Sequence, residues 1–172
     1  MNVKLRLLPA ALLLALLAAG CDSGNPGGPP QSFVTPLLGT YSGTRVVTEG
    51  SRPPTTENVT ITITQDPARA SVRLTLTSGS GTPEVTEGVY NDREIRLGGS
   101  ADGIQIEFVV DRNGNVTGSG QLARPDGLRG TITVTGSMTP RAIALDLDTR
   151  ITQGVTGTPT GQLNTTRIRA SR

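Results

Sequence analysis

The chain has 172 residues, which favours a single domain, and only 17% of its residues are charged and 2% aromatic. It contains no histidine and one cysteine, so a Ser-His-Asp triad, a histidine-ligated zinc site and an intrachain disulfide are excluded.

The first 20 residues predict a secretory signal peptide. Lys4 and Arg6 precede an apolar run at 7–19, which is too short to cross a membrane as a helix. Small residues at 18–20 then lead to the only cysteine, Cys21. Cleavage before Cys21 would leave 14 arginines, 14 acidic residues and no lysine. A neutral chain of this kind gives no support to nucleic-acid binding.

The run Ala18-Ala19-Gly20-Cys21 resembles the lipobox of bacterial lipoproteins, although Ala18 stands where that family prefers leucine. The resemblance implies cleavage by signal peptidase II, acylation of Cys21 with palmitate-type chains, and attachment to a membrane of a bacterial cell envelope, facing the periplasm or the exterior. Two or three acyl chains would make that anchor stable. The alternative is an ordinary signal peptide cut after Gly20. Residues 21–36 are rich in Gly, Pro and Ser, which predicts a flexible tether.

Residues 37–172 alternate apolar and polar side chains with a period of two, which predicts strands with one buried and one solvated face. Asn113-Gly114 and the turn at 125–127 separate such strands. The clearest strands, in chain order, are 58–64, 72–77, 94–97, 104–111, 131–135 and 142–148. Turn signals at intervals of roughly 8–12 residues favour an all-β, antiparallel up-and-down barrel of about eight to ten strands, with a β-sandwich as the alternative.

The segment Gly39-Thr40-Tyr41-Ser42-Gly43 resembles the first strand of lipocalin-like barrels, with Tyr41 where that family has tryptophan. In that family the ring plugs the closed end of the barrel beneath an arginine of the last strand. The resemblance therefore implies that Tyr41 lies against Arg167 or Arg169. We expect the strand near Tyr41 to pair antiparallel with 165–170, with a bulge between Leu163 and Ile168 because their parities differ. The alternative is a tyrosine that packs in an ordinary β core.

A possible calcium loop begins at Asp111, Asn113 and Asn115, but Val116 and Leu122 stand where glycine and glutamate would be needed. The segment therefore predicts a hairpin turn. We predict no metal, no cofactor and no catalytic activity.

Two functions stay open for the barrel. One is a monomeric, lipid-anchored binding protein that holds a small apolar or amphiphilic ligand inside the barrel, in contact with Ile106, Phe108, Ile132 and Leu145. The other is a structural or partner-binding envelope lipoprotein with a solid barrel. A cavity of at least about 300 Å³ would favour the first function.

Overall fold

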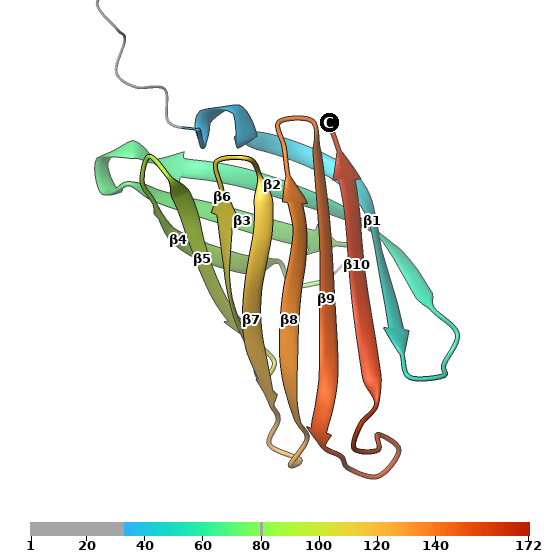
Figure 1. Ribbon diagram of the computed structural model, residues 1–172. Coiled ribbons are helices and arrows are strands. Elements are labelled where there is room, and N and C mark those ends of the chain that lie inside the picture. Colours follow the sequence, from blue (N-terminus) through green and yellow to red (C-terminus); the bar gives the residue numbers. More distant parts are fainter. Residues whose placement is uncertain (1–32, 80) are drawn as a thin grey trace, which may run out of the picture. The chain divides into compact units, whose positions relative to one another are not determined.

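The computed structural model describes residues 33–79 and 81–172, which form one closed antiparallel barrel (Figure 1). Each strand pairs with the next along the chain, and the last strand pairs with the first. The barrel predicted from the sequence is therefore confirmed, and the β-sandwich is excluded. The strands are β1 (Gly39–Glu49), β2 (Thr55–Asp66), β3 (Ser71–Ser78), β4 (Glu84–Tyr90), β5 (Glu94–Ala101), β6 (Ile104–Asp111), β7 (Asn115–Ala123), β8 (Arg129–Met138), β9 (Ala142–Gln153) and β10 (Leu163–Ser171).

Two single turns of 3-10 helix accompany the strands, η1 (Thr35–Leu37) and η2 (Pro67–Arg69). Within the described part of the chain, no helix is long and apolar enough to cross a membrane. The predicted signal peptide and Cys21 lie outside the described residues. Val34 is fully buried in the barrel core, so the folded part includes residues that composition had assigned to the tether.

The barrel closes between β1 and β10, in a register that runs from Ser42 opposite Ser171 to Glu49 opposite Asn164. The bulge expected in β10 is absent, because its pairing with β9 continues without a shift from Leu163 to Ser171. Leu163 instead faces solvent with 52% of its surface exposed, so its parity is not fixed by the core. A register shift does occur between β8 and β9, at Arg129 and Gly130.

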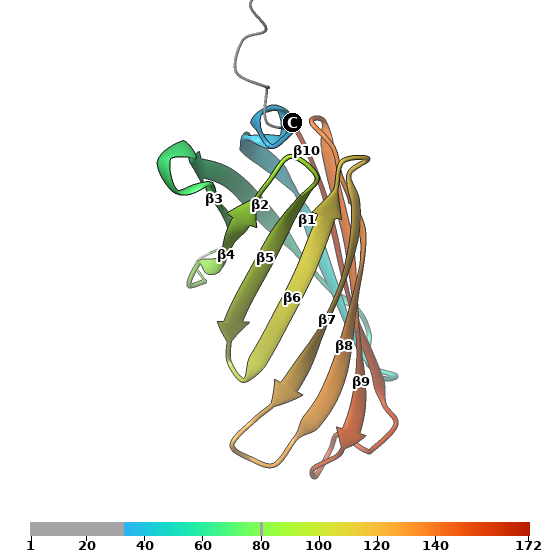
Figure 2. The ribbon, with the colours of Figure 1, turned by 60° about the vertical axis from the view of Figure 1, so that its left-hand side comes forward.

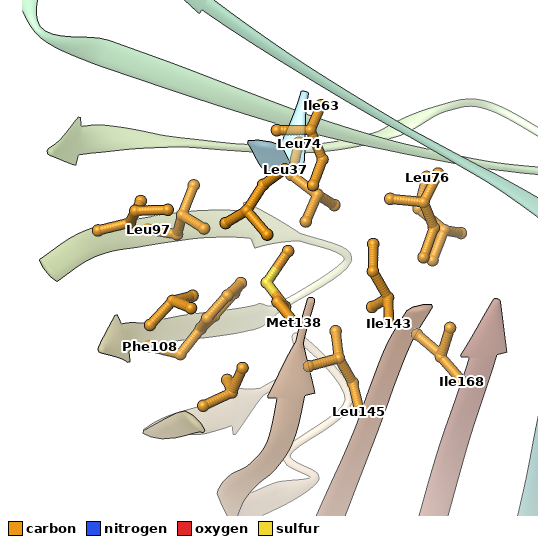
Figure 3. Packing of buried hydrophobic residues seen from close by; sticks show 14 of the residues in the cluster. Leu37, Ile63, Leu74, Leu76, Leu97, Phe108, Met138, Ile143, Leu145 and Ile168 are labelled. Carbon is orange, nitrogen blue, oxygen red and sulfur yellow. The ribbon is translucent and has the colours of Figure 1, made fainter. Parts of the chain in front are cut away.

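The inward faces of the strands pack a continuous apolar core at one end of the barrel, which we call the closed end. Figure 3 shows its side chains converging from opposite walls, with Phe108 and Leu97 across from Leu145 and Ile168. The closed end carries η1 and the β2–β3, β4–β5, β6–β7 and β8–β9 connections. The opposite end, which we call the open end, carries the remaining connections and lies at the bottom of Figure 2.

Tyr41 seals the closed end. Its ring is fully buried, and its hydroxyl donates hydrogen bonds to the carbonyl oxygens of Leu37 at 2.9 Å and Thr139 at 3.3 Å. The guanidinium group of Arg172 lies over the ring, 4.6 Å from its centroid. Burial raises the pKa of the Tyr41 phenol, and the charge of Arg172 partly opposes this.

The arginine over the ring is therefore Arg172, and neither Arg167 nor Arg169 as the lipocalin resemblance implied. Strand alternation explains the difference: Ile168 and Ala170 are buried, so Arg167 and Arg169 point outward. Arg169 makes an ion pair with Asp146 on the outer face at 2.7 Å.

Candidate functional site

A cavity of about 950 Å³ occupies the open end of the barrel. Residues of β1, β6, β7, β9 and β10 line it together with the connections at that end, including Arg52, Asp102 and Arg124. This volume lies at the upper end of the range of roughly 300–1,000 Å³ found for small-molecule sites. The barrel is thus solid at its closed end and hollow at its open end.

Inward positions of β9 and β10 become polar toward the open end. Thr149, Asn164 and Thr166 line the cavity there, whereas Leu145 and Ile168 occupy the corresponding inward positions of the core. A second, smaller apolar cluster forms at the rim from Leu122, Leu128 and Ile151, with Val155 packed against it. Leu122 and Leu128 of this cluster also line the cavity.

The lining of the cavity combines apolar and polar groups. Ile104, Leu122 and Leu128 supply apolar surface from β6, β7 and the β7–β8 connection, next to the charged Asp102 and Arg124. Glu49 and Asn164 supply polar groups from β1 and β10. An amphiphilic molecule would match such a lining better than a purely apolar one.

An ion-pair network lies inside the barrel on the β1–β4 wall, two residues along β1 from the cavity-lining Val47. Arg45 shares the inward parity of Tyr41 and donates from Nε to Glu57 Oε1 and from Nη1 to Glu84 Oε1, at 2.5 Å each. Its Nη2 also donates to the hydroxyl of Ser78 at 3.3 Å. One arginine therefore links β1, β2, β3 and β4 from within the lumen.

The network keeps its charges. Burial of Arg45 would lower its pKa, but the hydrogen bonds that it donates to Glu84 and Glu57, together with their charges, outweigh that effect and raise it. The hydrogen bond from Arg45 lowers the pKa of Glu57. The Arg45 side chain is 17% exposed, whereas those of Glu57 and Glu84 are 41% and 51% exposed. The carboxylates are thus accessible to solvent, and they adjoin the open-end cavity through Val47 without lining it themselves.

The residues predicted from sequence as ligand contacts lie elsewhere. Phe108, Ile132 and Leu145 are buried in the closed-end core, and Ile106 packs against that core while partly buried. None of the four lines the cavity. Alternation identified inward-facing residues, but it did not say which of them border empty space.

The functional residues that the sequence analysis missed are the charged ones inside the lumen. Arg45, Glu49 and Glu57 have the parity of the buried residues on β1 and β2, and Glu84 has the parity of the partly buried Tyr90 on β4. A charged residue at an inward position of a predicted barrel strand was the signal that could have located the wet part of the interior.

The Asp111 segment forms the β6–β7 hairpin turn, as predicted. The carboxylate of Asp111 accepts hydrogen bonds from the backbone nitrogens of Asn113 and Asn115 at 2.8 Å each, and from the Asn115 side chain at 2.8 Å. These bonds lower the pKa of Asp111. They also explain why aspartate and asparagine occur at these positions without invoking a bound cation. Among residues 33–79 and 81–172, no group of acidic or cysteine side chains is arranged to hold a metal.

The sequence matches no family model, and no curated protein matches it. Solved structures do resemble the barrel. One is a protein of unknown function of the DUF3598 family from Nostoc punctiforme PCC 73102, with 14% identity and a TM-score of 0.56 over 81% of this chain and 48% of that one. Another is an S-type phycobiliprotein lyase from Guillardia theta, with 16% identity and a TM-score of 0.49 over 81% of this chain and 90% of that one.

The chain therefore spans about half the length of the Nostoc protein. At this level of identity the likeness to the Nostoc protein shows a similar fold alone. It leaves the function to be argued from the cavity.

Proposed function

We propose that this chain is a lipid-anchored, non-catalytic protein of a bacterial cell envelope, and that its barrel binds a small amphiphilic ligand in the open-end cavity. The observation that carries the proposal is the cavity of about 950 Å³, whose lining combines apolar residues such as Leu122 with polar ones such as Asn164. The anchor is lipid on Cys21, followed by the tether, which would present the barrel away from the bilayer.

A binding role fits the chemistry available in the lumen better than catalysis does. From Cys21 onward the sequence contains no histidine and no lysine, and its one cysteine is the proposed anchor. The interior acid groups Glu57 and Glu84 are engaged by Arg45, and the rim carboxylate of Glu49 is engaged by Arg52 at 2.9 Å. The hydroxyl of Ser78, which lies beside Glu57, itself accepts a hydrogen bond from Arg45 Nη2 at 3.3 Å.

The proposal is tested by titrating the chain from Asp22 to Arg172, which contains every strand of the barrel, with the neutral fluorescent probe N-phenyl-1-naphthylamine. We expect saturable binding of one probe per chain. Thr166→Trp places a bulky ring in the cavity and should abolish binding, whereas Thr165→Trp on the outer face of the same strand should leave it unchanged.

Absence of saturable binding, or equal binding by the two tryptophan variants, would contradict the ligand-binding function. That result would favour the structural alternative, to which the solid closed end already conforms. Circular dichroism of both variants establishes that the barrel is retained.

A further inference from the structure

We propose that the ligand of this cavity carries a cationic head group, an amine or guanidine, which binds at Glu57 and Glu84. This inference rests on the proposed ligand-binding function and adds the chemical class of the ligand. It follows from the net negative charge of the network formed by Arg45, Glu57 and Glu84, and from the position of this network relative to the apolar residues of the cavity.

The charged pairs at the rim are balanced. Glu49 is paired with Arg52 at 2.9 Å, and Arg124 is paired with Asp126 at 3.3 Å. Asp102, the other charged residue of the lining, adds a negative charge. The rim therefore offers no excess positive charge to an anionic ligand.

The charge inside the lumen is unbalanced. Arg45 is one cation facing two carboxylates, Glu57 and Glu84, so this network carries a net negative charge. The partners of Arg45 raise its pKa and so favour its charged form, and the hydrogen bond from Arg45 lowers the pKa of Glu57. An anion entering here would have to compete with both carboxylates for Arg45, whereas a cation would restore neutrality.

The carboxylates retain the capacity to bind such a cation. Arg45 contacts the Oε1 atom of each one, and Glu57 also accepts a hydrogen bond from Ser78; a carboxylate has about four lone-pair sites, so both can accept a further hydrogen bond. Glu57 and Glu84 are 41% and 51% exposed, which allows an ammonium group to approach without complete loss of its water.

The strand order places Glu57 across the lumen from part of the apolar lining. Glu57 lies on β2 and Glu84 on β4, while the apolar residues Ile104 and Leu122 lie on β6 and β7. In the closed barrel β2 and β7 are separated by five steps in either direction around the ten strands, whereas only β5 separates β4 from β6. A molecule with its apolar tail against Leu122 would thus extend its head across the lumen to Glu57, which shares Arg45 with Glu84.

The test compares ligands that share one tail and differ in charge: dodecylamine, dodecanol and dodecanoate, each displacing N-phenyl-1-naphthylamine from the chain spanning Asp22 to Arg172 at neutral pH. We expect the amine to bind about threefold to tenfold more tightly than the alcohol, and the alcohol more tightly than the carboxylate. The preference should shrink when the salt concentration is raised from about 20 mM to about 500 mM.

Two near-isosteric variants locate the effect. Glu57→Gln and Glu84→Gln should each reduce the preference for the amine over the alcohol while leaving the affinity for the alcohol unchanged. Glu107→Gln, on the outer face of β6, is the matched control and should retain the full preference. The salt dependence of the unmodified chain tests the charge preference even where a variant is unstable.

Equal affinities for amine and carboxylate, or tighter binding of the carboxylate, would overturn the cationic class while leaving ligand binding intact. An undiminished preference in both lumen variants would overturn the assignment to Glu57 and Glu84. Failure of the naphthylamine probe itself to bind would instead contradict the proposed function.

Discussion

Arg172, the residue after the last strand, covers the ring of Tyr41 from the first strand, with its guanidinium carbon 4.6 Å from the ring centroid. Arg172 also donates a hydrogen bond to the carbonyl oxygen of Leu38. The contact therefore fastens the C-terminus to the start of β1 at the closed end, in addition to the backbone pairing of β1 with β10.

Tyr41→Phe should destabilise the barrel by about 1–3 kcal/mol, because the buried carbonyl groups of Leu37 and Thr139 lose the donor that satisfies them. Urea unfolding followed by circular dichroism measures the change. Tyr90→Phe is the control: Tyr90 is only partly buried at the edge of the same core, and its hydroxyl makes no hydrogen bond within the described residues. Equal losses in the two variants would contradict a special role for the Tyr41 hydroxyl.

Acid should weaken the lumen network in a defined pH range. The folded pKa of Glu57 lies below its ordinary value of 4.5, so its stabilising contribution is present above that value and is lost as the pH falls through the folded pKa. Glu57→Gln should therefore flatten the pH dependence of stability below about pH 4.5 and change it little near pH 7. Denaturant midpoints between pH 3 and pH 7 provide the measurement, with Glu107→Gln as the control.

Gly118 is hard to replace because the backbone of the neighbouring strand β6 lies very close to it. It lies opposite Phe108, and a β-carbon at Gly118 would come within 2.4 Å of the Phe108 β-carbon and 2.3 Å of the Glu107 carbonyl oxygen. Gly118→Ala should cost about 1–3 kcal/mol, since the strands must move apart. Gly98→Ala is matched to it in β5, where the nearest atom would be 3.6 Å away, and should be tolerated. Equal unfolding midpoints would show that β7 can shift to admit the methyl group.

The same glycines explain which strands could be delimited from sequence. The alternation of Val59, Ile61 and Ile63 with threonine predicted β2, because these three successive inward positions are large aliphatic residues. In β7 the inward positions include Gly118 and Gly120, so the alternation of apolar and polar side chains is interrupted although the strand is continuous. Neighbouring side chains such as Phe108 fill the space that these glycines leave, and that depends on register rather than on local sequence.

For a related reason, the cavity could not be predicted from local sequence patterns. Its existence depends on which inward residues face one another across the lumen, as Leu122 on β7 and Val47 on β1 do at the open end. Likewise, the partners of Arg45 come from β2, β3 and β4, and the sequence separation between Arg45 and Glu84 is 39 residues. Fold class and barrel closure followed from periodicity, whereas the position of the site required the register of all ten strands.

Cys21→Ser should release the protein from membranes, because the thioether-linked lipid needs the sulfur and the chain has no other cysteine. In a bacterial host we expect the unmodified chain to incorporate labelled palmitate and to sediment with membranes, and the variant to do neither once its signal peptide is removed. A matched control adds Ser23→Cys to Cys21→Ser, which restores a thiol two residues away from the proposed cleavage point and should not restore labelling. Palmitate labelling of that control would contradict recognition of a lipobox. Sedimentation of the cleaved Cys21→Ser chain with membranes would show that attachment does not depend on lipid at Cys21.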